Sequence, residues 1–287
     1  TILRELRSGN AAPSLDILWE VDYERRPLSV DEFFTDPAYC GDFLAEKLYA
    51  KWRDEFNQII DKHCVETIFT GAIGIGKTTA AVALNIFLLH RLLCMHDPCG
   101  FYNSTSVVFA LFSVIKSLSE SVEYGMITKL LLSSEFFRSM SAVSDEDNKR
   151  KPQNAIISFP KGIRFAFGSK AVHTLGQDVF SGIMDEVAFG GGGAESTQMK
   201  ELYNNVRRRM DSRFKDSRGA LPGVLCVCSS ANLEGDFLDT HIKQSQNTKS
   251  THIVSFAIWD VKPYDGPRFR VQVGDMVHGS RILDEVD

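Results

Sequence analysis

A glycine-rich segment carries the clearest chemistry in this 287-residue chain. Residues 71–78 read Gly-Ala-Ile-Gly-Ile-Gly-Lys-Thr and match the pattern G-x-x-x-x-G-K-[ST] at every fixed position. Glycines let successive backbone N–H groups turn inward around an anion, and the amino terminus of the following helix adds positive dipole. A polyphosphate fits this arrangement, with Lys77 at its β- and γ-phosphates and the Thr78 hydroxyl on Mg²⁺. The residues expected to contact the nucleotide are Gly71, Ala72, Gly74, Ile75, Gly76, Lys77, Thr78 and Thr79.

Two adjacent carboxylates stand near the end of a second apolar run, residues 179–187. Because ligands of open α/β sheets bind at the carboxyl ends of the strands, Asp185 and Glu186 are expected beside the glycine-rich loop. Asp185 would hold the Mg²⁺ shell, and Glu186 would polarise the attacking water as a general base. The pair favours an ATPase of the additional-strand type over a GTPase or a small-molecule kinase. Acidic pairs also end strands without such a role, so the assignment depends on the P-loop at residues 71–78.

A third element, residues 224–232, is a buried strand followed by small hydroxyl side chains. If this strand lies between the two strands already described, it would aim Ser229 or Ser230 at the γ-phosphate. A turn that simply ends the strand explains the same residues equally well.

The composition allows one large α/β domain with an added subdomain. Charged residues make up 24% of the chain and the net charge is -5, so any contact with DNA must be local. The six cysteines form no C-x-x-C pair, which argues against a zinc or redox site and predicts reduced core thiols. The longest apolar stretch, residues 82–95, is interrupted by polar side chains and is too short for a membrane span. We therefore expect a soluble, intracellular protein.

The first 42 residues predict an N-terminal arm or small lid. Prolines punctuate this segment, and Ser29 with Glu32 forms a capping box that predicts a short helix. Residues 43–60 predict one amphipathic helix, because their apolar side chains recur at steps of three and four. We expect the P-loop ATPase domain to span residues 43–262 and residues 263–287 to form a linker.

Strands and helices alternate through most of the chain. A hairpin is expected where residues 156–159 and 163–167 flank a Pro-Lys-Gly turn. Further strands are expected at residues 65–70, 106–114, 179–187, 224–229 and 253–258. The alternation predicts an α/β fold of the additional-strand, RecA-like P-loop NTPase type, with a mainly parallel sheet flanked by helices.

Together these elements resemble the large terminase subunit of tailed bacteriophages. The order GAIGIGKT, then IMDE at a strand end, then CSSAN after a later strand is similar to that family's Walker A, Walker B and coupling motifs. The stretches LYNNVRRRMDSRF, LPG and EGDFLD also look like a terminase. The resemblance runs from about Tyr49 to Val273.

The resemblance implies a motor domain that hydrolyses ATP with Mg²⁺. In that family a homo-oligomeric ring docks on a portal protein, acts with a small terminase subunit and drives double-stranded DNA into a procapsid. The expected location is the host cytoplasm, with transient binding to the procapsid portal and no membrane contact. The residues that the resemblance implies to couple hydrolysis to DNA movement are Ser229, Ser230, Ala231 and Asn232.

The terminase family also has a metal-dependent nuclease domain of RNase H type, which needs several separated carboxylates on its own sheet. Only about 20 residues follow Pro267, too few to fold such a domain. We therefore expect residues 263–287 to lead toward a nuclease domain that this chain lacks, and we expect no DNA cleavage by the chain.

Two positions depart from the family pattern. Terminase P-loops often carry a basic residue early in the loop, where this chain has Ala72 and Ile73. Many also have an arginine where Leu175 precedes Gly176. The arginine finger is therefore unassigned, and its candidates are Arg138, Arg150, Arg207, Arg208 and Arg209.

A helix expected at residues 196–214 places Arg207 and Arg208 on its outer face. These side chains could bind DNA phosphates or an acidic face of a neighbouring subunit, although a solvated surface helix is the simpler interpretation. Glycines 190–193 predict a loop that changes shape with the phosphate state. Trp52, or Arg53 beside it, could border the adenine, but core packing is favoured for Trp52.

Two other functions stay open at this point. A helicase or another DNA-dependent P-loop enzyme is disfavoured because the chain has no second RecA-like half. A nucleotide-binding switch that hydrolyses slowly is disfavoured because Glu186 stands beside Asp185.

Overall fold

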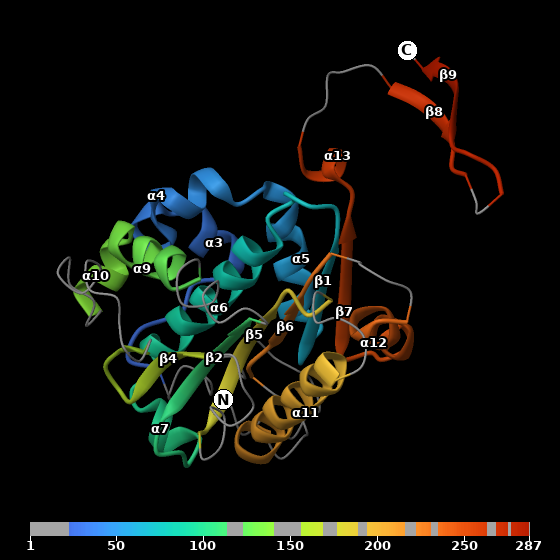
Figure 1. The fold of residues 1–287 in the computed structure, drawn as a ribbon. Helices are drawn as coiled ribbons and strands as arrows, with labels where there is room; N and C mark the ends of the chain where they lie inside the picture. The colour runs from blue at the N-terminus through green and yellow to red at the C-terminus, as the bar shows by residue number, and fades with distance from the viewer. Residues whose placement is uncertain are drawn as a thin grey trace, which may run out of the picture.

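The computed structural model describes residues 23–113, 123–140, 156–168, 177–188, 194–215, 222–230, 235–262, 268–274 and 277–286, arranged as Figure 1 shows. The strands are β1 (Glu66–Gly71), β2 (Val107–Ser113), β3 (Ile156–Ser158), β4 (Ile163–Gly168), β5 (Val179–Asp185), β6 (Leu225–Cys228), β7 (Thr251–Phe256), β8 (Arg268–Gln272) and β9 (Arg281–Val286). The helices are α3 (Val30–Thr35), α4 (Pro37–Lys47), α5 (Ala50–Asp61), α6 (Lys77–Cys94), α7 (Pro98–Phe101), α9 (Tyr124–Ser133), α10 (Glu135–Met140), α11 (Ala194–Phe214), α12 (Phe237–Ser245) and α13 (Ile258–Val261).

Seven strands form one sheet in the order β3-β4-β2-β5-β6-β1-β7. Each neighbouring pair from β4 to β7 runs parallel, and β3 joins β4 in the antiparallel direction. The predicted α/β fold with a mainly parallel sheet is therefore confirmed. Strand β6 lies between β5 and β1, which is the additional-strand arrangement that the sequence predicted.

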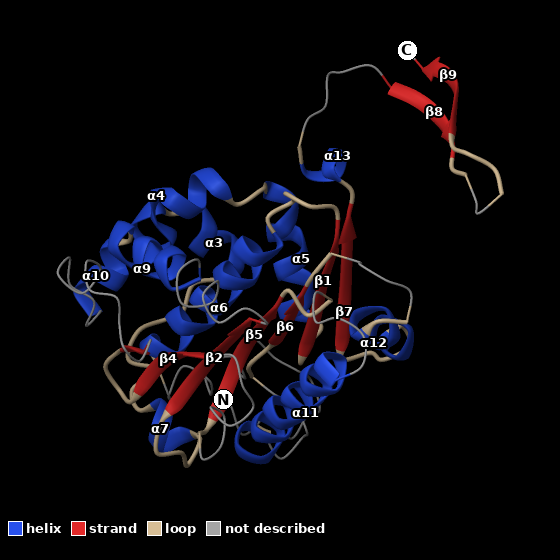
Figure 2. Cartoon of the chain, viewed as in Figure 1, coloured by secondary structure: helices blue, strands red, loops and turns tan. Residues whose placement is uncertain are grey.

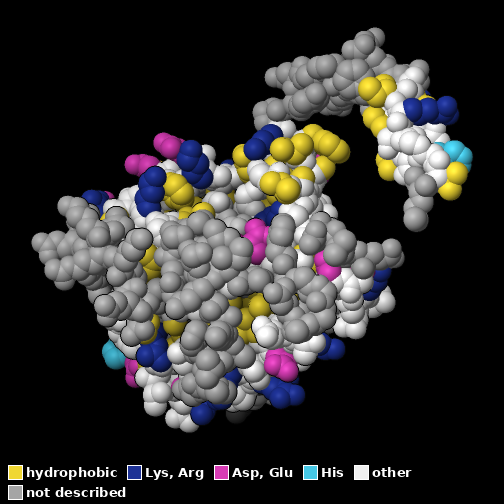
Figure 3. Space-filling model, in the orientation of Figure 1, with side chains coloured by type: hydrophobic (Ala, Val, Ile, Leu, Met, Phe, Trp, Pro, Cys, Tyr) yellow, Lys and Arg dark blue, Asp and Glu magenta, His cyan; other side chains and the backbone are white. Residues whose placement is uncertain are grey.

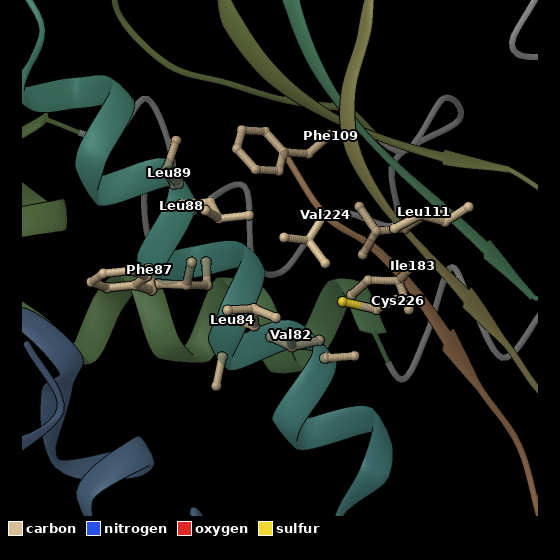
Figure 4. Packing of buried hydrophobic residues seen from close by; sticks show 14 of the residues in the cluster. Val82, Leu84, Phe87, Leu88, Leu89, Phe109, Leu111, Ile183, Val224 and Cys226 are labelled. Atoms are coloured by element: carbon tan, nitrogen blue, oxygen red, sulfur yellow. The ribbon is translucent and has the colours of Figure 1, made fainter. Parts of the chain in front are cut away.

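Helices cover both faces of the sheet, as Figure 2 shows. Helix α6 is the central one, because it packs against β1, β5 and β6, while α11 packs against β5. Figure 4 shows apolar side chains of α6 facing side chains of β2, β5 and the segment that contains β6. The labelled residues in this contact are Val82, Leu84, Phe87, Leu88, Leu89, Phe109, Leu111, Ile183, Val224 and Cys226.

Helix α6 is long and apolar enough, by length and composition, to cross a membrane, but 78% of it is buried inside the protein. Its two buried polar side chains, Asn85 and His90, are hydrogen-bonded within the fold. Asn85 donates to the Ala81 carbonyl at 2.9 Å and accepts from the Ser181 hydroxyl at 2.9 Å. These contacts identify α6 as a core helix, in which the buried polar residues have specific partners.

The N-terminal helices α3 and α4 pack into the same core as α6. Ser29 and Glu32 form the predicted capping box, with reciprocal hydrogen bonds of 3.2 and 2.8 Å between side chains and backbone amides. The side chains of Phe33 and Cys40 are fully buried in the main hydrophobic cluster. The boundary at residue 42 between an arm and the ATPase domain stays a prediction, and α4 runs across it.

The single helix predicted over residues 43–60 is wrong. Leu48 and Tyr49 have extended backbone angles (ψ of 115° and 138°), so α4 ends at Lys47 and α5 begins at Ala50. The apolar spacing continues across the break because both helices present their apolar side chains to one core. Periodicity therefore could not reveal the break.

Strands β8 and β9 form an antiparallel hairpin apart from the main body, within the segment predicted to be a linker. Figure 3 shows exposed hydrophobic side chains over α13, the last helix before it, where Trp259 is 69% exposed. Whether residues 263–287 lead to another domain stays a prediction.

The hairpin predicted around the Pro-Lys-Gly turn is present as β3 and β4, with positive φ at Lys161 and Gly162. Residues 124–140 form α9 and α10. The glycine loop 190–193 lies outside the described residues. The cysteines are free thiols, and all but the half-buried Cys99 are buried.

Candidate nucleotide site

The glycine-rich loop joins the carboxyl end of β1 to the first turn of α6. Gly71, Gly74 and Gly76 have φ values of 104°, 81° and 82°, a region that side chains with a Cβ rarely adopt. Gly71 is also tightly enclosed, because a Cβ there would lie 2.2 Å from the carbonyl oxygen of Phe256. The start of the loop is bound to β7 as well, since the Ala72 amide donates to that carbonyl at 2.9 Å.

Lys77 is the first residue of α6 and turns its ammonium back into the loop. The Nζ atom donates to the Ala72 carbonyl at 2.8 Å and to the Ser230 hydroxyl at 2.8 Å. Burial lowers the pKa of Lys77, and the nearby acidic groups oppose that effect. The ammonium is therefore held at the point where the loop, α6 and the end of β6 meet.

Asp185 and Glu186 lie beside the loop, at the carboxyl end of β5. The Thr78 hydroxyl donates to Asp185 Oδ2 at 2.8 Å, which joins two residues that are 107 positions apart in sequence. The other carboxylate oxygen accepts the backbone amide of Glu186 at 3.0 Å. Glu186 itself has φ of 58°, a strained conformation for a residue with a side chain, and such conformations concentrate at functional sites.

The protein environment shifts both carboxyl groups in the same direction. Burial raises the pKa of Asp185, and the hydrogen bonds from Thr78 and from the Glu186 amide lower it. Burial and then the Asp185 charge raise the pKa of Glu186, while the Lys77 charge lowers it. A carboxylate with a raised pKa is a stronger base, which suits Glu186 to accepting a proton.

The end of β6 lies between the loop and the acidic pair, as the strand order requires. Ser229 donates its amide to the Phe69 carbonyl of β1 at 3.2 Å, and its hydroxyl accepts the Ala188 amide at 3.1 Å. Ser230 accepts the hydrogen bond from Lys77. Ser229 thus contacts β1 and the segment after β5, and Ser230 contacts the start of α6. Ala231 and Asn232 lie outside the described residues.

The residues present fit a Mg²⁺ ion that is held together with a nucleotide. Thr78 and Asp185 supply a hydroxyl and a carboxylate oxygen 2.8 Å apart, and hard oxygen donors of this kind are the ligands that Mg²⁺ prefers. No cluster of three or more His, Cys, Asp or Glu able to hold a metal occurs among the described residues. Mg²⁺ typically takes one or two protein ligands and completes its shell with water and phosphate, so it needs no such cluster.

Sequence reasoning missed how α5 holds the loop. The Trp52 indole, fully buried, donates to the carbonyl of loop residue Ile75 at 2.9 Å. The favoured core packing of Trp52 is therefore confirmed, and adenine contact by Arg53 stays a prediction. Tyr49, just before α5, lies near Gly76, where a Cβ would be 3.7 Å from its ring.

The candidates for the arginine finger lie on different elements of the fold. Arg207 donates to the carbonyl of Val65 at 3.3 Å, at the amino end of β1, whereas the loop follows its carboxyl end. Within one chain Arg207 therefore lies at the end of β1 opposite to the loop and does not reach it. Arg208 is exposed on α11 and Arg138 lies on α10. Contact with DNA or with a neighbouring subunit's nucleotide stays a prediction for these residues, and Arg150 lies outside the described part of the chain.

Solved structures similar to this chain include phage terminases. The large terminase of a thermophilic bacteriophage aligns over 76% of this chain and 47% of its own, with 12% identity and a TM-score of 0.47. The complex of the same terminase with ATP-gamma-S aligns with 13% identity and a TM-score of 0.47. The Thermus Phage P74-26 large terminase ATPase domain aligns over 72% of this chain and 86% of its own, with 13% identity and a TM-score of 0.41. The chain spans less than half the length of the first of these terminases.

No curated protein matches the chain. A family model described as "Uncharacterized protein MJ0330, N-terminal P-loop domain" matches residues 23–269, which is most of the sequence. This match covers the loop, the acidic pair and the strand between them. The chain therefore belongs to the family of the N-terminal P-loop domain of uncharacterized protein MJ0330 and has a P-loop NTPase fold.

Proposed function

We propose that this chain is a Mg²⁺-dependent ATPase that powers the movement of double-stranded DNA. One observation carries the enzymatic part of the proposal. The hydrogen bond between Thr78 and Asp185 brings the phosphate-binding loop and the acidic pair into one site. Together the loop and Asp185 can hold Mg²⁺ with a nucleotide, and Glu186 beside Asp185 adds a carboxylate that can serve as the base for hydrolysis.

Each residue of the site has a role that follows from its position. The backbone amides of the loop and the Lys77 ammonium would bind the phosphates. Thr78 and Asp185 would hold Mg²⁺, which when bound neutralises the charge that develops on the phosphates. Glu186 would accept a proton from the attacking water, and its raised pKa supports this role.

The DNA-moving part of the proposal is supported by the resemblance of the three motifs to terminase motors. The resemblance also provides the expected partners, namely double-stranded DNA, a portal protein, a small terminase subunit and further copies of the chain in a ring. The proposed location is the host cytoplasm, with transient binding to a procapsid portal. Arg208 on α11 and Arg138 on α10 are both exposed, so both are available for contact with DNA.

Two competing functions make different predictions. A helicase or another DNA-dependent ATPase would also be stimulated by DNA, but by single strands at least as strongly as by duplex. A slow switch would bind ATP tightly and turn it over at nearly the same rate with or without Glu186. Turnover that requires Glu186 and is stimulated more strongly by duplex than by single strands is expected only for the proposed motor.

The test is steady-state ATP turnover without DNA, with single-stranded DNA and with double-stranded DNA, in Mg²⁺ and in EDTA. Lys77→Ala is expected to lose nucleotide binding, because the cation at the phosphates is removed. Glu186→Gln is expected to bind ATP normally and to lose turnover by a factor of at least about 10², the usual contribution of a general base. Equal turnover in Glu186→Gln and the wild type would remove Glu186 as the base, and stimulation only by single-stranded DNA would favour the helicase.

A further inference from the structure

The phosphate-binding loop needs support from outside, because its own sequence makes it flexible. Three of its residues are glycines with positive φ, and glycine has more accessible backbone conformations than any other residue. An unsupported loop of this kind would have to become ordered each time a phosphate binds, and that ordering opposes binding. A rigid neighbour that fixes the loop beforehand would therefore increase affinity.

Trp52 is such a neighbour. Its indole N–H donates to the Ile75 carbonyl at 2.9 Å, in the middle of the loop and 23 residues away in sequence. The indole ring is fully buried and makes edge-on contacts with Phe69 of β1 and Phe256 of β7, with centroids 4.8 and 5.0 Å away. The ring is therefore fixed by the two strands that flank the loop, and its single donor points at the loop.

Neighbouring contacts fix the helix that carries Trp52. His252 of β7 and Glu55 of α5 lie 2.6 Å apart, and Lys51 lies 3.7 Å from Asp260. The first two turns of α5 are thus tied to β7 and to the segment that continues from it. The Ala72 amide binds the same strand, so the loop and the helix that supports it are both fixed to β7.

We propose that Trp52 is a positioning residue of the nucleotide site, whose indole N–H holds the Ile75 carbonyl outward and keeps the loop open for a triphosphate. This inference rests on the proposed function. A phenylalanine would keep an aromatic ring in the core, although it is smaller than an indole, and it has no donor for the carbonyl. The function of the tryptophan therefore lies in its N–H, beyond its packing.

The decisive variant replaces only that N–H. In a Trp19→Phe, Trp259→Phe background, Trp52 is the sole tryptophan. A tryptophan auxotroph can incorporate 3-benzothienylalanine at this position. This analogue has sulfur in place of the N–H and almost the same shape as tryptophan. We expect about ten-fold weaker Mg²⁺-ATP binding, equivalent to about 1.4 kcal/mol, with kcat reduced less than two-fold, because the indole touches no reacting atom. Trp52→Phe should behave in the same way.

Phe56→Leu is the matched control, because Phe56 is an equally buried side chain on the same helix, one turn further on. It should lower the melting temperature without changing the ATP dissociation constant. Hydrogen exchange of ligand-free protein gives a readout that does not depend on nucleotide. Peptides covering residues 71–76 should exchange faster in the Trp52 variants and unchanged in Phe56→Leu.

These measurements distinguish a failure of the role proposed for Trp52 from a failure of the proposed ATPase function. Unchanged affinity and unchanged loop exchange in the benzothienyl protein would overturn the role of Trp52 while leaving the ATPase intact. An equal loss of affinity in Phe56→Leu would also overturn it, since the effect would then come from stability alone. A wild-type protein that fails to bind Mg²⁺-ATP would instead refute the proposed function.

Discussion

His90 provides a test of how the N-terminal segment is attached to the core. This histidine is fully buried in α6, and its Nε2 accepts the backbone amide of Leu28 at 3.1 Å. Only the neutral ring can accept this hydrogen bond. Burial, with smaller effects of Arg91 and Arg25, lowers the pKa of His90 from 6.5 to about 4.

The magnitude follows from the two pKa values. Because the folded-state pKa lies below the unfolded one, the unfolded chain binds more protons between pH 6.5 and about 4. The contribution to stability is complete above pH 6.5 and is lost as the pH falls through this window. The whole difference amounts to about 3 kcal/mol at about 1.4 kcal/mol per pH unit, and about 2 kcal/mol of it is lost by pH 5.

The assay is urea unfolding at pH 8 and pH 5. Between these values the free energy of unfolding of the wild type should fall by about 2 kcal/mol more than that of His90→Gln, which does not titrate. His63→Gln, at an exposed histidine, should fall as much as the wild type does. Equal losses in His90→Gln and the wild type would show that His90 is not neutral and buried, and the packing of residues 28–35 against α6 would need revision.

Two further predictions concern the site. Since Glu186 must be unprotonated to act as a base and its pKa is raised above 4.5 by burial and by Asp185, kcat should fall with decreasing pH along a limb centred above that value. A pH–rate profile tests this, and a limb centred at or below pH 4.5 would contradict it. Gly71→Ala should lower the free energy of unfolding by more than about 2 kcal/mol, because φ is 104° and the new Cβ would lie 2.2 Å from a carbonyl oxygen. Gly125→Ala, in α9 with open space around it, should be neutral or stabilising, and equal effects of the two in thermal unfolding would contradict the argument.

The sequence was sufficient for the parts of the site that are local. The loop and the acidic pair each occupy a few consecutive residues, so their geometry follows from glycine φ angles and from the end of a strand. The sequence left open whether the strand before Ser229 lies between the strands that precede the loop and the acidic pair, because strand order depends on pairings between distant segments. In the observed sheet β6 does lie between β5 and β1.

Trp52 shows why the remaining parts could not be predicted. Apolar periodicity counts tryptophan as a core residue and ignores its N–H, whose partner is fixed by tertiary structure. The break at Leu48 was hidden for a related reason, since the apolar spacing fits one helix as well as two that face the same core. Arg207 lies at the end of β1 opposite to the loop. No local sequence pattern predicts which end of β1 is contacted by helix α11.

The hydrogen bonds of Lys77 and Thr78 indicate how a nucleotide would be sensed. Lys77 donates to the hydroxyl of Ser230, and Thr78 donates to the carboxylate of Asp185. Under the proposed function the Thr78 oxygen ligates Mg²⁺ through a lone pair, so the hydroxyl proton can keep its hydrogen bond to Asp185. Lys77 differs, because a phosphate would compete with Ser230 for its ammonium protons. Ser230 stands at the end of the strand between the loop and the base, so this hydrogen bond is a direct contact through which β6 would respond to the phosphate.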